Sequence, residues 1–534
     1  MPAPSPLSGL PQRAATTDGL PSPASIWDSV DSPTSSNGMQ RSSSGDTLDY
    51  DVVPPYHPAR TLVLCFDGTG DQFDADNSNI VKFFSLLKKD DRNEQMVYYQ
   101  PGIGTYSSAQ SAYPLRAKLD NLLDSMFAWH LSDHVSAGYE FLMQNYNAGD
   151  KICLFGFSRG AYTARALAGM LHKVGLLPAC NHQQVPFAYK MFTREDELGW
   201  KQSTVFKKAF SIDVDIDFIG VWDTVASVGL VPRTLPFTTS NRAIRVFRHA
   251  VALDERRARF QANLYKHPSK QDAERGTRPG DMPKTDTEYA TRVAVSEPKP
   301  PKLKKNKKKK QASLSLGGGG GSSRKQYERL FNSEDAGEHS QETDVLEVWF
   351  AGCHCDVGGG SVTDDVPHTL ARIPLRWMIR ECFRTNTGIR FHGDLLRAIG
   401  LDPAALHPLV AERPPPLQPD AQYMSTVAPP LPQATEEEHE IRDALSPVYD
   451  QLDLAWYWWF LEFMPMKKRV LGPAPEYKQS KQLTLNRGTG RVVPKRHKPF
   501  YVHRSVKLRM EAKGLKDGPY MPKAQYINEP IWVD

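Results

Sequence analysis

The sequence predicts an α/β fold built on a mostly parallel sheet with helices on both faces. Short, nearly continuous apolar runs recur along the chain, as in strands that are buried on both sides. Stretches with helical spacing separate these runs. The chain has 534 residues, of which 40% are hydrophobic and 24% charged, and this is enough for one large core with additions.

Five apolar runs predict strands, and each ends at a polar or glycine-containing turn. They cover residues 61–66, 96–99, 152–155, 216–222 and 345–351. Between the second and third runs, apolar residues recur at helical spacing from about 115 to 147. The carboxyl ends of parallel strands meet at one edge of a sheet, so the residues just after each run are candidates for a site.

Three other regions define the domain organisation. Residues 1–55 are rich in Ser, Pro, Gly, Thr and Asp and are predicted to be disordered, because they cannot bury enough apolar surface. Residues 268–340, which hold seven lysines within 302–310 and a run of glycines at 317–321, predict a flexible insertion. The core is then assigned to 60–267 and 341–400. The rest, 401–534, is expected to contain a Pro-rich loop at about 405–445, an aromatic helix and a final core-associated segment.

Charge and cysteine usage indicate the cellular setting. The net charge is only +5 and much of it is local to the lysine run, so no specific nucleic-acid binding is expected. The lysine run is either a nuclear-localisation signal or anionic-surface patch, or a solvated charge block. The six cysteines show no disulfide spacing, and neither a signal peptide nor an apolar run of about 18 residues is visible. We expect an intracellular protein, cytoplasmic or nuclear.

The segment 151–170 carries the strongest functional signal. Its apolar run leads into Gly-Phe-Ser-Arg-Gly at 156–160, and small residues follow at helical spacing. The order strand, sharp turn, helix is that of a nucleophile elbow, in which flanking glycines let the serine hydroxyl project from the sheet edge. The alternative is a structural turn serine, since the pentapeptide also arises by chance. The flanking pattern favours Ser158 as a nucleophile.

A serine nucleophile needs an adjacent base, and the base needs an orienting acid. Asp223 follows the 216–222 run and His354 follows the 345–351 run, so both are expected at the same sheet edge as Ser158. The chain order Ser, Asp, His is that of α/β-hydrolases, which predicts a catalytic triad. The alternative role of Asp223 is a turn or helix cap. His249 lies in a stretch that looks helical and is expected to be structural, whereas His503 is the alternative base.

The oxyanion of a tetrahedral intermediate needs backbone N–H donors. One is expected from Arg159, the residue after the nucleophile, and the second from the loop after the first strand, around Gly68 and Thr69. Asp67 in that loop is either a partner of these groups or a turn residue.

Three other interpretations compete with the triad. Cys-His-Cys-Asp at 353–356 suggests a metal cluster, but four consecutive residues cannot converge on one ion, so no metal or cofactor is expected. Asp356 is the alternative acid, in a Ser/Asp dyad similar to that of patatin-type lipases, although Val357 replaces the glycine that follows the acid there. The last rival is a catalytically silent scaffold of the same fold, whose lysine-rich loop binds an acidic partner or a membrane.

The aromatic segment 456–464 is too short to span a membrane. Burial in the core or in a pocket wall is the favoured interpretation. Peripheral membrane contact is the alternative, because Lys467, Lys468 and Arg469 follow directly.

Four segments together resemble one family. They are Phe-Asp-Gly-Thr at 66–69, Gly-Phe-Ser-Arg-Gly-Ala at 156–161, Gly-Val-Trp-Asp-Thr-Val at 220–225 and Trp-Phe-Ala-Gly-Cys-His-Cys-Asp-Val-Gly-Gly-Gly at 349–360. Across roughly 60–400, with a weaker tail to about 510, the chain is similar to the α/β-hydrolase family typified by type VI secretion phospholipase effectors, which has uncharacterised fungal members. The resemblance implies a lipase or esterase whose triad is Ser158, Asp223 and His354, with a lipid, phospholipid or other carboxylic ester as substrate. The composition of the two ends is more like that of a fungal intracellular protein than of a secreted toxin.

Overall fold

The described residues of the computed structural model belong to one compact unit, Ser43–Asp534. The structure describes residues 51–69, 71–102, 127–225, 235–266, 342–420, 423, 434–472, 478–495, 499–516 and 518–534, with the side chains of 127–130 left out. Of the segment 1–55 that is predicted to be disordered, residues 1–50 lie outside the described residues, whereas Val52 and Val53 form a short paired strand, so the prediction is wrong at its end. The start of the helix predicted from about 115 and the insertion at 268–340 also lie outside the described residues.

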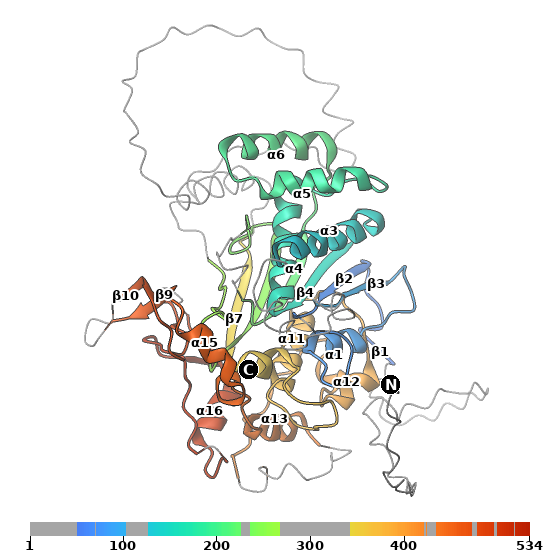
Figure 1. Ribbon diagram of the computed structural model, residues 1–534. Helices are drawn as coiled ribbons and strands as arrows, with labels where there is room; N and C mark the ends of the chain where they lie inside the picture. Colours follow the sequence, from blue (N-terminus) through green and yellow to red (C-terminus); the bar gives the residue numbers. More distant parts are fainter. Residues whose placement is uncertain are drawn as a thin grey trace, which may run out of the picture. The chain divides into compact units, whose positions relative to one another are not determined.

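An eight-stranded parallel sheet forms the centre of this unit (Figure 1). Every neighbouring pair of its strands is parallel. From one edge to the other, the strands are β12 (Ile531–Val533), β11 (Tyr501–His503), β7 (Asp344–Phe350), β6 (Ile244–Ala252), β5 (Ile216–Trp222), β4 (Lys151–Phe157), β2 (Thr61–Phe66) and β3 (Gln95–Gln100). This confirms the α/β fold predicted from the sequence. The chain reverses its direction of growth beside β2, and such a switch point is where open α/β sheets place their sites.

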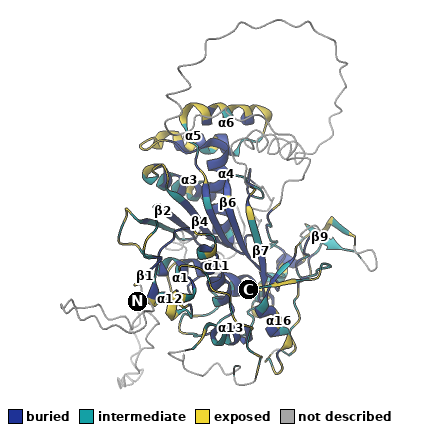
Figure 2. Ribbon diagram, turned by 180° about the vertical axis from the view of Figure 1, so that it is seen from behind, coloured by how far each residue is buried: buried dark blue, intermediate teal, exposed yellow. Residues whose placement is uncertain are grey.

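Helices cover both faces of the sheet, and alternate strand residues divide between two cores. Leu62 and Leu64 of β2 pack in one core with α3 (Phe127–Asn145), α4 (Ser158–Val174), α5 (Val185–Thr193) and α6 (Glu197–Phe210). Val63 and Cys65 point to the other core, with α1 (Asn79–Leu86) and α11 (Arg372–Arg384). Because both faces are covered, the central strands β2, β4, β5 and β6 are buried over most of their length (Figure 2).

The remaining elements are short and lie mostly in the last third of the chain. β1 (Val52–Val53) pairs with β8 (Phe391–His392), and β9 (Met466–Leu471) pairs with β10 (Gln479–Thr484), both antiparallel. The others are η2 (His182–Gln184), α10 (His354–Gly358), α12 (Gly393–Ala398), η3 (Pro403–Ala405), α13 (Glu436–Leu445), α14 (Gln451–Leu454), η5 (Trp456–Trp458), α15 (Trp459–Glu462) and α16 (Arg504–Glu511). Among the described helices, none is both long and apolar enough to cross a membrane.

The five predicted strands correspond to β2, β3, β4, β5 and β7, but the sequence missed β6. The stretch that begins at His249 was expected to be helical, and this is wrong, because it belongs to a strand between β5 and β7. Arg248 and His249 obscure the apolar pattern. Inside the fold, Glu381 pairs with the arginine and Glu347 with the histidine, so both can be buried in a central strand.

The loop predicted over about 405–445 is wrong at its end, where residues 436–445 form α13. Thr435 caps this helix and Glu438 completes a capping box. Three glutamates in the first turn also stabilise the helix, because their negative charges interact favourably with the positive end of the helix dipole.

The aromatic segment was expected to be buried, and for most of its side chains this is wrong. Trp456, Phe460 and Phe463 are exposed, while Leu461 and Glu462 face inward. The segment forms short helical turns, η5 and α15, on the surface, so only one side of it reaches the core.

Candidate active site

Ser158 lies at the sharp turn between β4 and α4. The strand is buried up to Phe157, and Ser158 is the first residue of the helix. Its φ of 56° falls in the left-handed region, which residues other than glycine adopt rarely and at a cost in energy. Backbone strain at a serine between a strand and a helix is the geometry of a nucleophile elbow.

The two glycines of the turn allow backbones to meet. A Cβ on Gly156 would lie 2.5 Å from the carbonyl oxygen of Gly160. A Cβ on Gly160 would lie 2.2 Å from the oxygen of Phe66 and 2.3 Å from that of Asp67. Only glycine fits at either position, and the close approach brings the carboxyl end of β2 beside Ser158.

His354 connects Ser158 to Asp223. It is the first residue of α10, just after β7, and its Nε2 lies 2.7 Å from Ser158 Oγ. Its Nδ1 lies 2.5 Å from Asp223 Oδ2. A carboxylate only accepts, so Nδ1–H donates to Asp223 and Nε2 accepts from the serine hydroxyl. The structure thus brings together the three side chains that the sequence predicts for the triad, and all three are buried.

The charges around His354 suit it to accept a proton. Burial lowers the pKa of the imidazole below its usual 6.5, although Asp223 opposes this, so the ring is neutral at neutral pH. Burial alone would raise the pKa of the Asp223 carboxyl. The cation of Arg491 and the hydrogen bond from His354 outweigh burial and hold that pKa well below its usual range.

Arg491 is the main site residue that the sequence did not reveal. It lies 268 residues after Asp223, between β10 and β11. Its Nη1 lies 2.6 Å from Asp223 Oδ1 and its Nη2 lies 2.8 Å from Oδ2. It also donates to the carbonyls of Ala252 and Phe260. No motif surrounds it, so only the folded chain shows this contact.

Two aromatic rings flank the imidazole, and a third ring and an ion pair pack behind one of them. Phe157 lies 4.7 Å from His354 and Phe260 lies 4.8 Å from it, both measured between ring centroids. Trp458 packs on the edge of Phe260 at 5.6 Å. The guanidinium of Arg257, paired with Glu255, lies over both the Phe260 and Trp458 rings. This wall shields the histidine from water and connects it to the surface segment η5.

The loop after β2 is the expected oxyanion loop, and Asp67 organises it. Asp67 accepts hydrogen bonds from Ser78 Oγ at 2.6 Å, from Tyr99 Oη at 2.8 Å and from the Gly68 amide at 2.8 Å. The Gly68 amide is therefore engaged within the loop. Thr69 keeps a buried hydroxyl oxygen without a hydrogen-bond partner in the structure. These contacts make Asp67 a partner that holds the loop in place.

Arg159, the other expected oxyanion residue, is the second residue of α4. The amides of a first helical turn have no partner within the helix, and the helix dipole favours negative charge there. The side chain of Arg159 lies close enough to Asp71 to oppose a rise in the pKa of that carboxyl, which burial and neighbouring aspartates cause.

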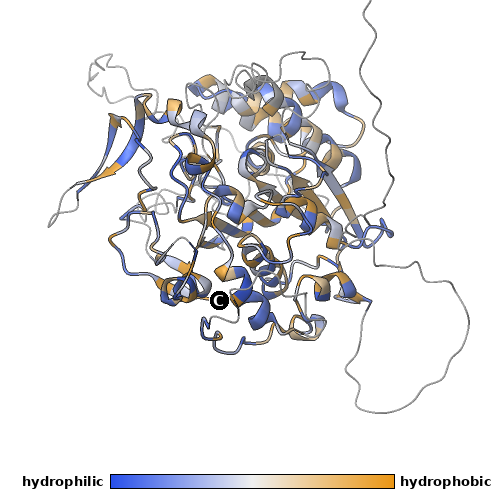
Figure 3. Cartoon of the chain, turned by 60° about the horizontal axis from the view of Figure 1, so that its bottom comes forward, coloured by the Kyte–Doolittle hydropathy of each residue, from blue (hydrophilic) through white to orange (hydrophobic). Residues whose placement is uncertain are grey.

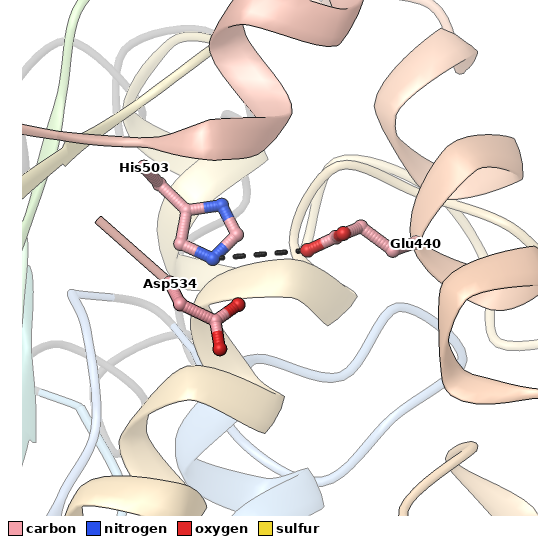
Figure 4. Close-up of side chains that lie close together, drawn as sticks. All are labelled: Glu440, His503 and Asp534. Atoms are coloured by element: carbon pink, nitrogen blue, oxygen red, sulfur yellow. Dashed lines mark ion pairs between the residues drawn. The ribbon is translucent and has the colours of Figure 1, made fainter. Parts of the chain in front are cut away.

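His503, the alternative base, lies in a different environment. Its Nδ1 bonds to Ser505 Oγ at 2.8 Å, and its Nε2 lies 3.8 Å from Glu440 Oε1 (Figure 4). Burial lowers the pKa of this imidazole to about 3, in spite of Glu440. These contacts are structural, and none of them is with Ser158.

Among the described residues, Glu440, His503 and Asp534 form the one group spaced for a metal ion. Arg413 Nη1 already lies 2.9 Å from Glu440 Oε1 and 3.1 Å from Asp534 Oδ1, and Arg504 pairs with the same two carboxylates. Because arginines neutralise both acids, the group is an ion-pair network.

Asp356 and His249 also have structural contacts. Asp356 Oδ2 accepts from the amides of Cys353 and Tyr449, and burial raises the pKa of this carboxyl to about 7. The amide of Thr224 donates to His249 Nε2 at 3.0 Å, so Nδ1–H of that ring donates to Glu347. The histidine thereby fixes the backbone directly after Asp223.

A serine hydrogen-bonded to a histidine, which is bonded to a buried aspartate, defines the side-chain arrangement of triad hydrolases. The family model described as "T6SS, Phospholipase effector Tle1-like, catalytic domain" matches residues 60–381. The chain belongs to this family, which confirms the resemblance seen in the sequence.

The relatives and solved structures that are similar to this chain are longer than the regions that they share with it. An uncharacterized protein of Saccharomyces cerevisiae is 31% identical over 414 residues, which cover 65% of this chain and 60% of the yeast protein. Among solved structures, the chain is similar to an uncharacterized protein from Pseudomonas aeruginosa, with a TM-score of 0.30, 15% identity and coverage of 64% of this chain and 49% of that one. It is also similar to the Tle1 effector in its structure with the VgrG spike of the type 6 secretion system, with a TM-score of 0.25, 17% identity and coverage of 58% and 57%. The chain spans about half to three fifths of the length of these relatives.

Proposed function

We propose that the protein is a serine hydrolase that cleaves carboxylic esters of lipids or phospholipids through an acyl-enzyme. The observation that carries the proposal is the continuous hydrogen-bonded path from Ser158 Oγ through His354 to Asp223. Family membership supports the lipid class of the substrate.

In the proposed first step, Ser158 Oγ attacks the ester carbonyl carbon while His354 Nε2 takes its proton. The lowered pKa of the histidine keeps it neutral and ready to do so. Asp223 holds the tautomer with the proton on Nδ1 and stabilises the imidazolium that forms. The tetrahedral intermediate collapses, the alkoxide leaves with the proton from Nε2, and the acyl group stays on the serine. Water, deprotonated by the same nitrogen, then releases the carboxylic acid.

The developing oxyanion is assigned to the amides of Arg159 and of the loop at Gly68 and Thr69. The first lies at the start of α4, where the helix dipole favours negative charge. Of the loop groups, the Gly68 amide already bonds to Asp67, which favours Thr69 as the second donor.

A fluorophosphonate probe tests the nucleophile, because it phosphonylates only activated serines. We expect labelling of the wild type and none of Ser158→Ala. Ser85→Ala, a serine on α1 whose hydroxyl bonds only to a local carbonyl, is the matched control and should label normally. Failure of the folded wild type to label would favour the alternative, a catalytically silent scaffold of the same fold. Hydrolysis of phospholipid, neutral lipid and short-chain ester panels then defines the substrate.

A further inference from the structure

An exposed aromatic ridge lies beside the candidate site. The large side chains of Trp456, Phe460 and Phe463 are 83%, 71% and 58% exposed, and Leu454 and Tyr457 are exposed as well. We call these five residues the aromatic ridge. Soluble proteins rarely expose so many large apolar side chains within one short segment, and such patches mark interaction sites.

The neighbouring hairpin adds positive charge to the ridge. β9 begins four residues after α15 and pairs with β10, with Lys467 opposite Leu483 and Arg469 opposite Lys481. Cross-strand partners share a face, as do residues two apart, so these three cations and Leu483 lie on one side of the hairpin. Figure 3 shows hydrophilic and hydrophobic residues together on this hairpin, which extends outward from the sheet domain.

The acidic residues nearby do not offset this charge. Residues 454–472 and 478–484 contain five bases, Lys467, Lys468, Arg469, Lys478 and Lys481, and a single acid, Glu462. Glu462 is buried and accepts from the amides of Ala258 and Gly488. The surface therefore presents aromatic rings and cations together, the composition of helices and loops that lie in the interface of a bilayer.

The ridge is also fixed to the candidate site. Glu462 accepts a hydrogen bond from the amide of Ala258, in the loop that carries Phe260. Trp458, between Trp456 and Phe460, packs on Phe260, and Phe260 packs on the imidazole of His354. A surface held by the ridge is thus held next to the nucleophile.

We propose that the aromatic ridge and the cationic face of the β9–β10 hairpin dock the protein on a bilayer that contains anionic phospholipids. The proposal rests on the proposed function for its purpose, since docking presents lipid esters to Ser158, but the binding itself is independent of hydrolysis. Three other exposed apolar side chains, Leu198, Val205 and Phe210, lie on α6, a helix that packs against α4 on the sheet face away from α11. They serve as a control.

The test is sedimentation of the full chain with vesicles of phosphatidylcholine alone or with phosphatidylserine added, in a Ser158→Ala background so that no lipid is consumed. We expect the triple variant Trp456→Ala, Phe460→Ala, Phe463→Ala to lower vesicle partitioning about tenfold or more. Lys467→Gln combined with Arg469→Gln and Lys481→Gln, the three cations of that face, should remove the preference for phosphatidylserine and leave the aromatic contribution. Trp458 is left intact in every variant because it contacts Phe260.

The control variant Leu198→Ala, Val205→Ala, Phe210→Ala should bind vesicles like the parent. With Ser158 restored, the ridge variant should keep its turnover of a soluble short-chain ester and lose turnover on vesicles. Equal vesicle binding by the ridge variant and the parent overturns the proposal, as does equal loss in the α6 control. Binding to a soluble protein partner, but to neither vesicle type, also overturns it. Vesicle binding without ester turnover would instead overturn the proposed function and leave the docking surface standing.

Discussion

Arg491 donates hydrogen bonds to both carboxylate oxygens of Asp223, at 2.6 and 2.8 Å, while His354 donates to one of them. The aspartate is fully buried, so the guanidinium is its main compensating charge. A bidentate arginine also fixes the plane of the carboxylate, and hence the direction from which the imidazole is held. We infer that Arg491 positions the acid of the candidate triad.

Replacing Arg491 should separate positioning from simple stability. Arg491→Met leaves a buried carboxylate without its partner and is expected to lower the free energy of unfolding by about 3–5 kcal/mol. Arg491→Lys keeps a charge but not the planar pair of donors, so it should recover most of the stability and only part of kcat. Thermal denaturation and ester kinetics on both variants measure this. Equal recovery of stability and kcat by lysine would contradict a positioning role.

The pH–rate profile should show a histidine with a lowered pKa. Only neutral His354 accepts the serine proton, and burial holds its pKa below 6.5. The acid limb of kcat/KM is therefore expected to have its midpoint below that value. Arg491→Lys retains the nearby charge and should leave the midpoint almost unchanged, whereas Arg491→Met should shift it upward, because loss of a cation favours the imidazolium.

The Ser158→Gly variant of the protein should be more stable than the Ser158→Ala variant. Both changes remove the nucleophile, but only glycine adopts a φ of 56° without strain. Ser158→Gly is expected to exceed Ser158→Ala in stability by about 1 kcal/mol, and both should lose activity by several orders of magnitude. Denaturant titration of the two inactive variants provides the comparison. Equal stabilities would show that the turn relaxes at this position.

Acid should remove the stabilising contribution of two buried histidines before the ion-paired carboxylate of Glu440 titrates. Burial lowers the pKa of His503 to about 3 and that of His439 to about 4, from 6.5. Since the unfolded chain binds these protons first, the contribution of the two histidines to stability is fully present above about pH 6.5 and is lost as pH drops toward their folded pKa values. Each histidine contributes up to about 1.4 kcal/mol per pH unit in that window. Glu440, which is ion-paired with arginines, has a pKa of about 2, so its contribution to stability is lost only at lower pH.

His503→Gln should reduce the slope of stability against pH between 6.5 and 4. His182→Gln, at an exposed histidine on η2, is the matched control and should leave that slope unchanged. Urea denaturation at several pH values measures both variants. An unchanged slope in His503→Gln would mean that protonation of this histidine does not contribute to the pH dependence of stability.

Gly160 should not tolerate a side chain. Its Cβ would overlap the carbonyls of Phe66 and Asp67, so Gly160→Ala is expected to cost about 1–3 kcal/mol and to displace the loop beside Ser158. Gly149→Ala is an informative comparison, because its φ of +94° strains alanine while nothing lies within 4 Å of the added Cβ. A larger loss of activity in Gly160→Ala than in Gly149→Ala, at matched stability, would place the effect at the site.

The sequence was sufficient where the pattern is local. Uninterrupted apolar runs predicted five strands, and the strand–turn–glycine pattern predicted the turn at Ser158. It failed where burial depends on distant partners. β6 was missed because Glu381 and Glu347, from other elements, neutralise the arginine and histidine within it. Arg491 and Phe260 reach the site from loops that no periodicity marks, and the exposure of Trp456 depends on which side of its short helix the fold leaves open.

The parallel sheet does not stop where the shared family segment stops. The match ends at residue 381, yet β11 pairs with the edge of β7, and β12 pairs with β11. A protein shortened to the matched segment would leave the outer edge of β7 without its backbone partners and Asp223 without its cation. The segment that the family model covers and the segment that must be produced together to complete the sheet and the candidate site are therefore different lengths of this chain.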